Sequence, residues 1–211
     1  MKNLFLTFAL LLCPIIAYNQ ENNVIKLPEP QLDKGKPLMQ VLEERQSIRT
    51  YSDKEIPLQE MGNLLWAADG INRKESGKRT APSAMNRQEI DVYVSTKDGL
   101  YRYDPQNHAL VTILNKDIRS LTGSQAYVAT APVNLIYVSN LDKMGSDRQS
   151  NIETTNIDAG FIAQNVYLYC ASENMATVVR GSIDKTKLAT EMGLTQNQYI
   201  IVAQTVGYPI E

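Results

Sequence analysis

Two arginines and a serine alternate near position 45 of this 211-residue chain, in the run Arg45–Arg49 (Arg-Gln-Ser-Ile-Arg). In an extended segment, alternate side chains point to the same side, so the two guanidinium groups and the hydroxyl would converge. Guanidinium groups pair bidentately with the oxygens of phosphates and carboxylates. The run therefore predicts an anion-binding site. The alternative is that the arginines cap helix carbonyls or pair with Glu43 and Glu44.

A second run, Arg79–Asn86, combines small residues with a proline and an asparagine (Arg-Thr-Ala-Pro-Ser-Ala-Met-Asn). Pro82 stiffens the main chain, and the small residues permit the close approach of a flat ligand. Asn86 offers both hydrogen-bond donors and acceptors. The alternative is an ordinary surface turn that precedes a strand beginning at Ile90.

A third run, Thr177–Gly181, follows a long apolar segment. Gly181 would let main-chain N–H groups approach a ligand, and Arg180 beside it could favour an anionic form of that ligand. The alternative is a plain connection from a helix to a strand, with a solvated arginine.

The composition argues against several other kinds of chemistry. The chain has one histidine and two cysteines, so its side chains cannot assemble a zinc-type cluster, and no metal is expected. Cys170 lies in an apolar run, where a buried and unreactive thiol is expected. The formal net charge of −2 gives no reason to expect a nucleic-acid partner.

The elements that must position these runs follow from hydrophobic periodicity. The pattern predicts helices over Leu38–Arg45, from Ser52-Asp53 to Gly70, and over Asp117–Thr130, Asn156–Asn174 and Asp184–Met192. It predicts strands over Ile90–Ser95, Leu100–Tyr103, Ala109–Ile113, Pro132–Ser139 and Tyr199–Val206, and polar loops over Ile71–Arg79 and Asp142–Asn151. The helix Asn156–Asn174 is apolar nearly all round, which indicates a central helix or a subunit interface. Together these elements predict an α+β protein.

The first twenty residues have the layout of a signal peptide. Lys2 is the only charge before Glu21, the run Leu4–Leu12 is apolar except for Thr7, and the small residue Ala17 follows. The apolar run is too short to span a bilayer. We therefore expect residues 1–20 to direct export to the periplasm or cell envelope. The alternatives are a lipid anchor at Cys13 and an N-terminal core helix.

Taken in order, these runs resemble the nitroreductase family. The resemblance rests on Arg-x-Ser-x-Arg at 45–49, Pro-Ser-x-x-Asn at 82–86 and the segment Asp158–Leu168, and it covers Met39–Pro209. Two further segments, Lys78–Ala84 and Gly99–Asp104, are most similar to the branch that contains the azoline (thiazoline and oxazoline) oxidases.

The resemblance implies a fold, an assembly and a cofactor. The fold would be nitroreductase-like, a small, mostly antiparallel sheet surrounded by helices, with an FMN-binding domain over residues 38–211 in an intertwined homodimer. The implied FMN contacts are Arg45, Gln46, Ser47 and Arg49 around the phosphate and ribityl chain, Pro82, Ser83, Ala84 and Asn86 along the ring and ribityl, often from the partner subunit, and Val179, Arg180 and Gly181 at the reactive edge.

The implied activity is the transfer of a hydride from NAD(P)H, or another donor, through FMN to a small organic acceptor such as a nitroaromatic or a quinone. Because the flavin carries the chemistry, no catalytic side chain is assigned. Arg180 is the candidate cation for stabilising the anionic reduced ring. The alternatives are an exported flavin-binding protein without NAD(P)H turnover and a secreted, non-enzymatic interaction domain.

The sequence departs from the family pattern in two ways. Many members carry a basic residue near the C-terminus that reaches the FMN phosphate, whereas no basic residue follows Lys187 here. Lys187, Lys78 and Arg79 are the candidate substitutes. The azoline oxidases use a Lys-Tyr pair as a base, and this sequence has no Lys-Tyr dipeptide, which counts against azoline oxidation.

Overall fold

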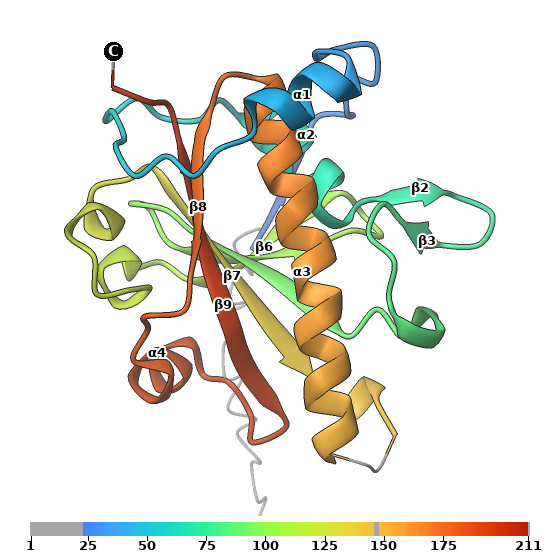
Figure 1. Ribbon diagram of the computed structural model, residues 1–211. Helices are drawn as coiled ribbons and strands as arrows, with labels where there is room; N and C mark the ends of the chain where they lie inside the picture. Colours follow the sequence, from blue (N-terminus) through green and yellow to red (C-terminus); the bar gives the residue numbers. More distant parts are fainter. Residues whose placement is uncertain (1–22, 146–147, 211) are drawn as a thin grey trace, which may run out of the picture.

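An antiparallel sheet forms the centre of the molecule (Figure 1). The computed structural model describes residues 23–145 and 148–210, and within these ranges the main sheet has seven strands in the order β1-β6-β5-β4-β7-β9-β8. They are β1 (Val24–Lys26), β4 (Ile90–Ser95), β5 (Leu100–Asp104), β6 (Ala109–Leu114), β7 (Val133–Asn140), β8 (Ala176–Arg180) and β9 (Gln198–Gly207). Every neighbouring pair is antiparallel. The predicted α+β fold is confirmed.

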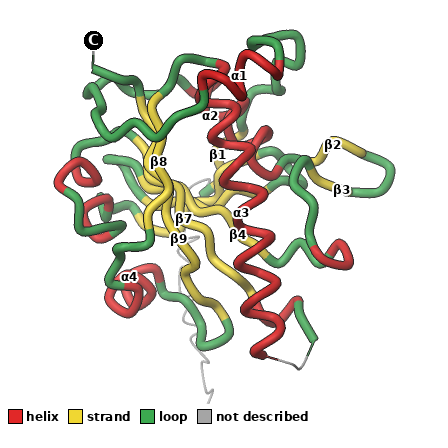
Figure 2. Tube along the Cα trace, viewed as in Figure 1, coloured by secondary structure: helices red, strands yellow, loops and turns green. Residues whose placement is uncertain are grey.

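Helices cover both faces of this sheet (Figure 2). They are α1 (Leu38–Glu44), α2 (Leu58–Asp69), α3 (Arg148–Ser172) and α4 (Lys185–Met192). Along β7, Leu135 and Tyr137 join the core that contains α2 and α3, whereas Ile136 and Val138 join the core that contains α4. Because both of its faces are covered, β7 is a continuous apolar run, as predicted.

The ends of α4 illustrate why local signals predicted most helix boundaries. The side chain of Asp184 accepts a hydrogen bond from the main-chain N–H of Lys187 at 3.0 Å, which caps the N-terminus. Gly193 has a φ of 67° and ends the helix in the left-handed region that glycine adopts without strain. The predicted helix Asp184–Met192 is confirmed by these caps.

Helix α3 is longer than predicted and is not buried on every side. It begins at Arg148 rather than at Asn156, so it takes up part of the segment predicted as a loop, and the short helix η4 (Leu141–Lys143) takes up more. The polar residues of its first turns did not signal a buried helix, yet Thr155 is fully buried. On the outer face, Ile157 is 61% exposed and Phe161 is 42% exposed.

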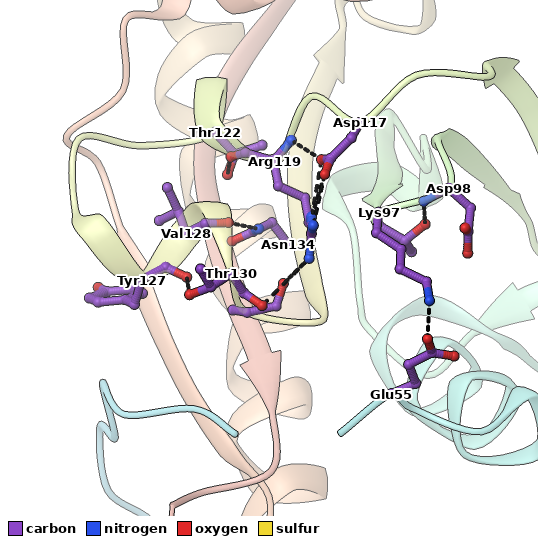
Figure 3. Close-up of polar contacts among 12 residues, drawn as sticks. Glu55, Lys97, Asp98, Asp117, Arg119, Thr122, Tyr127, Val128, Thr130 and Asn134 are labelled. Atoms are coloured by element: carbon purple, nitrogen blue, oxygen red, sulfur yellow. Dashed lines mark hydrogen bonds and ion pairs between the residues drawn. The ribbon is translucent and has the colours of Figure 1, made fainter. Parts of the chain in front are cut away.

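The prediction of a helix over Asp117–Thr130 is wrong. The segment instead forms two short helices, η2 (Arg119–Leu121) and η3 (Ala126–Ala129). Arg119 donates to the carbonyl of Ala131 at 3.0 Å, and the hydroxyl of Thr122 donates to the carbonyl of Arg119 at 2.8 Å (Figure 3). The Thr122 bond is local and competes with a continuous helix, whereas the Arg119 bond joins the start of the segment to the residue after its end.

The prediction of a loop over Ile71–Arg79 is also wrong. Two short strands, β2 (Ile71–Arg73) and β3 (Lys78–Arg79), form a ribbon that projects from the molecule near α3 (Figure 1). Gly77 has a φ of 62°, which gives the turn. Arg79 anchors the base of the ribbon through an ion pair with the buried Asp69. Because the strands lack alternating apolar residues, their sequence gave no periodic signal.

None of the helices in the described ranges is long and apolar enough to cross a membrane. The predicted signal peptide and the alternative lipid anchor at Cys13 lie outside the described residues.

Candidate functional site

The segment Arg45–Arg49 leaves α1 and runs beside β8, the edge strand of the sheet. The main-chain N–H of Ile48 donates to the carbonyl of Thr177 at 3.0 Å. The predicted alternation is present, because Gln46 and Ile48 line a cavity of about 300 Å³ whereas Arg45, Ser47 and Arg49 do not. Gln46 and Ile48 thus share one side of the chain, as the alternation predicts, and Ser47 between them contacts Tyr167.

Tyr167 of α3 connects this first run to the third. Its hydroxyl oxygen lies 3.0 Å from Oγ of Ser47 and accepts a hydrogen bond from the main-chain N–H of Val179 at 2.9 Å. The guanidinium carbon of Arg45 lies 5.3 Å from the centre of the Tyr167 ring. Because the Tyr167 oxygen accepts from Val179, its own proton can be donated to Ser47, which leaves the Ser47 proton for a ligand. Tyr167 was not among the predicted site residues, because Asn165 and Tyr169 of the same helix are also polar and nothing in the sequence distinguishes Tyr167 from them.

Arg45 and Arg49 have no carboxylate partner among the residues that the structure describes. Glu44, one of the alternative partners, instead pairs with Lys36 at 2.5 Å. Arg49 is exposed, and its one hydrogen bond to the described residues is a long bond of 3.5 Å to the carbonyl of Ser47. Two guanidinium groups without a counter-charge, beside a hydroxyl that can donate, suit an anion with several oxygens.

The second run forms a compact loop against the N-terminal half of α3. Asp158 accepts a hydrogen bond from the main-chain N–H of Ala84 at 2.9 Å, and Oγ of Ser83 accepts one from the N–H of Gln88 at 3.0 Å. Met85 and Asn86 both have a φ of 55°, in the left-handed region that costs energy for residues other than glycine. The loop is held in this shape by its bond to α3 and by hydrogen bonds within itself, such as that from Asn86 N–H to the carbonyl of Ser83.

The first and second runs do not meet within one chain. The first contacts α3 at Tyr167 and the second contacts it at Asp158, which places them about 14 Å apart along the helix axis. In Figure 1, α1 lies at the C-terminal end of α3, whereas the loop after β3 reaches the other half of the helix. One chain thus supplies two separate parts of the predicted site.

The third run is a strand rather than a loop, since Thr177–Arg180 belong to β8. Arg180 is only 6% exposed, and its guanidinium donates to Oγ1 of Thr205 at 3.0 Å and to Oγ1 of Thr122 at 3.2 Å. It also donates to the carbonyl of Thr122 and to Oδ1 of Asn134. Burial lowers the pKa of Arg180 to about 10. The structure contradicts a solvated Arg180, because its described hydrogen bonds all go to other parts of the protein, and a role of Arg180 toward a ligand stays a prediction.

The three candidate substitutes for a C-terminal basic residue lie elsewhere in the chain. Arg79 is paired with Asp69, and Lys78 is in the ribbon beside the second run. Lys187 is on α4, which packs on the sheet face opposite to α3. None of the three makes a described contact with Arg45–Arg49 in the same chain.

Comparison with known proteins identifies the class to which this fold and site belong. The chain matches the nitroreductase family model over residues 42–208. It is 28% identical over 202 residues to a protein of Methanocaldococcus jannaschii named as a candidate nitroreductase, covering 90% of this chain and 99% of that one. A crystal structure from Ralstonia eutropha, named in the same way, shares 42% identity and a TM-score of 0.85 over 90% of each chain. The chain belongs to the nitroreductase family and is an oxidoreductase of that family.

One more distant structure bears on the predicted branch. The E. coli microcin synthetase complex, solved with a truncated precursor bound, has 19% identity and a TM-score of 0.70, covering 97% of this chain and 85% of that one. At this identity the likeness shows the shared fold alone. The resemblance to the azoline oxidases stays a prediction.

Proposed function

We propose that this chain is an FMN-dependent oxidoreductase that passes a hydride from NAD(P)H, or another donor, through FMN to a small organic acceptor such as a nitroaromatic or a quinone. The observation that carries the proposal is the arrangement of Arg45 and Arg49, free of carboxylates in the described chain, around a Ser47 hydroxyl held by Tyr167. This arrangement suits the phosphate of FMN.

The residues present can be assigned to parts of the cofactor. Arg45 and Arg49 would bind the phosphate oxygens, and Ser47 would donate to the phosphate or the ribityl chain. When bound, FMN supplies a ring that accepts a hydride and passes its electrons to a second substrate. Since the described hydrogen bonds of Arg180 all go to the protein, stabilisation of charge at the ring would fall to main-chain N–H groups.

We propose a homodimer in which the loop Pro82–Asn86 of the second copy completes the flavin site. Two observations support this: the two runs are separated along α3, and the outer face of α3 exposes Ile157 and Phe161. Exposed apolar side chains that follow one helix face are typical of a protein–protein contact. Met85, in the loop itself, is a further exposed apolar side chain, at 83%.

The proposed localisation is the periplasm or cell envelope, on the strength of the signal-like residues 1–20. NAD(P)H is expected to be scarce there, which favours a different electron donor or a flavin-binding protein without NAD(P)H turnover as the second candidate. Azoline oxidation is not proposed, because the sequence has no Lys-Tyr dipeptide.

The visible spectrum of the purified mature chain, before and after the addition of FMN, tests the proposal. We expect a yellow protein whose bound flavin spectrum differs from that of free FMN. Bleaching by NADPH or NADH under nitrogen would support the enzyme, and recovery of the colour with a nitroaromatic or a quinone would identify the acceptor class. A flavin that binds but stays oxidised with both nucleotides would support the second candidate.

A further inference from the structure

Glu89 is the most unusual buried side chain in the described structure. It follows the second run, immediately before β4, and it is 0% exposed. Neither of its carboxyl oxygens has a side-chain hydrogen-bond donor among the described residues, and its own main-chain N–H is the donor that acts on it. A carboxylate buried without a donor is costly, so such a group normally takes up a proton.

The group that faces Glu89 is a second carboxyl, that of Asp158 on α3. Asp158 is only 4% exposed, and its Oδ2 accepts the hydrogen bond from Ala84 at 2.9 Å. Two buried carboxylates side by side repel each other, and the repulsion disappears when one proton lies between them. A proton held between the two carboxyls would supply the side-chain donor that the Glu89 oxygens lack among the described residues.

We propose that Glu89 and Asp158 share one proton, and that this proton holds the loop Pro82–Asn86 against α3, so that assembly of the flavin site depends on pH. The link to flavin rests on the proposed function, whereas the hold on the loop does not. Glu89 and Asp158 would be positioning residues, since neither needs to touch a ligand. The strained φ angles of Met85 and Asn86 make the loop ready to move once this contact weakens.

Charged side chains of both signs surround Glu89 and Asp158. Lys143, from η4, donates to the carbonyl of Gln88 at 3.0 Å and to Asp91 at 3.1 Å, and its charge opposes protonation of Glu89. On the side of α2 and β3, Asp69 and Arg79 pair with each other and line the same small cleft as Asp158.

The raised pKa of Glu89 gives the direction of the pH effect. Burial, reinforced by Asp158, raises the pKa of Glu89 from 4.5 to about 7. A carboxyl with a raised pKa contributes stability that is fully present below about pH 4.5 and is lost as the pH rises through about 7. The loop should therefore be held most firmly in mildly acidic solution and should loosen above neutrality. Burial raises the pKa of Asp69 as well. A pH effect in the wild type alone could therefore come from Asp69, and variants of Glu89 and Asp158 are needed to assign it.

Hydrogen exchange of the Ala84 amide in the flavin-free full chain tests the proposal at pH 6 and pH 8, after correction for the intrinsic exchange rate. In the wild type, we expect the protection of the Ala84 amide to fall as the pH rises through the pKa of Glu89. Well above that pKa, the release of one proton sets a limiting slope of about tenfold per pH unit. Glu89→Gln keeps a neutral donor facing Asp158 and should keep the protection constant. Asp158→Asn keeps the acceptor for Ala84 and supplies an amide donor to Glu89, so it should do the same. Glu75→Gln, an identical change at an exposed position of the ribbon, should behave as the wild type.

Equal wild-type protection at both pH values, or the same decline in Glu89→Gln as in the wild type, would overturn the proposal. If Glu89→Gln does not fold, Asp158→Asn decides in the same way. FMN titrations at the two pH values form a separate arm, in which the wild type should bind more weakly at pH 8 and Glu89→Gln should not. Failure to bind FMN at either pH would count against the proposed function and leave the exchange result to judge the shared proton.

Discussion

The hydroxyl oxygens of Ser47 and Tyr167, 120 positions apart in the sequence, lie 3.0 Å from each other. Tyr167 also accepts a hydrogen bond from Val179, so one side chain of α3 fixes the first run relative to the edge strand β8. The fold thus places both Ser47 and Arg45 beside Tyr167.

Replacing Tyr167 with phenylalanine should weaken both this contact and cofactor binding. The change removes the acceptor for Val179 and the partner of Ser47, and we expect a loss of about 1 kcal/mol in the free energy of unfolding. Denaturant unfolding and FMN titration would measure the two effects. Tyr127→Phe is the matched control, because the described residues give the Tyr127 hydroxyl no hydrogen bond. A Tyr167→Phe protein as stable as the control, with unchanged FMN affinity, would remove Tyr167 from the site.

Gly123→Ala should destabilise the fold through Arg180. A Cβ atom at Gly123 would lie 2.3 Å from Nη1 of Arg180, whose guanidinium is fixed by its buried hydrogen bonds and cannot easily move. We expect a cost of about 1–3 kcal/mol, as for overpacking in a core, measured by thermal or denaturant unfolding. A Cβ atom at Gly145 would come no nearer than 3.9 Å to the Arg87 side chain, which is an ordinary contact, so Gly145→Ala should be close to neutral. Equal effects of the two changes would show that the Arg180 network is not rigid.

Phe161→Glu should prevent the proposed dimer without unfolding the chain. Phe161 is 42% exposed on the outer face of α3, so a charge there costs little in one chain but much in a packed interface. Sedimentation velocity should show a dimer for the wild type and a monomer for the variant. Leu32→Glu, at a site 70% exposed in the segment before α1, should remain dimeric. A monomeric wild type, or a Phe161→Glu variant that is still a dimer, would contradict the proposed assembly.

The fold was predictable where a local signal decided the structure. The alternation of Ile90, Val92 and Val94 placed β4, and Asp184 and Gly193 set the ends of α4. The sequence failed to predict structure where side chains form long-range bonds to the main chain, as at Arg119 and Ala131, and where a polar stretch is buried, as at the start of α3.

In the candidate site, too, features set by local sequence were predicted and features set by long-range contacts were not. Alternation alone placed the two arginines of the first run on one side of the chain. The position of Arg180 could not be predicted, because its burial depends on Thr122, Asn134 and Thr205, which are far away in the sequence. Tyr167 was missed for a similar reason, since only the fold brings Ser47 to it.

FMN binding by Arg45→Ala and Arg49→Ala, measured by quenching of flavin fluorescence, tests the central claim most directly. Arg102→Ala, at an exposed arginine on β5, is the control. If the first run binds the FMN phosphate, the wild type and the control should bind FMN equally. Each of the other two variants should then lose about 1.5–3 kcal/mol, or roughly tenfold to 150-fold in affinity. A wild type that does not bind FMN, or affinities that are the same in all four proteins, would contradict the account.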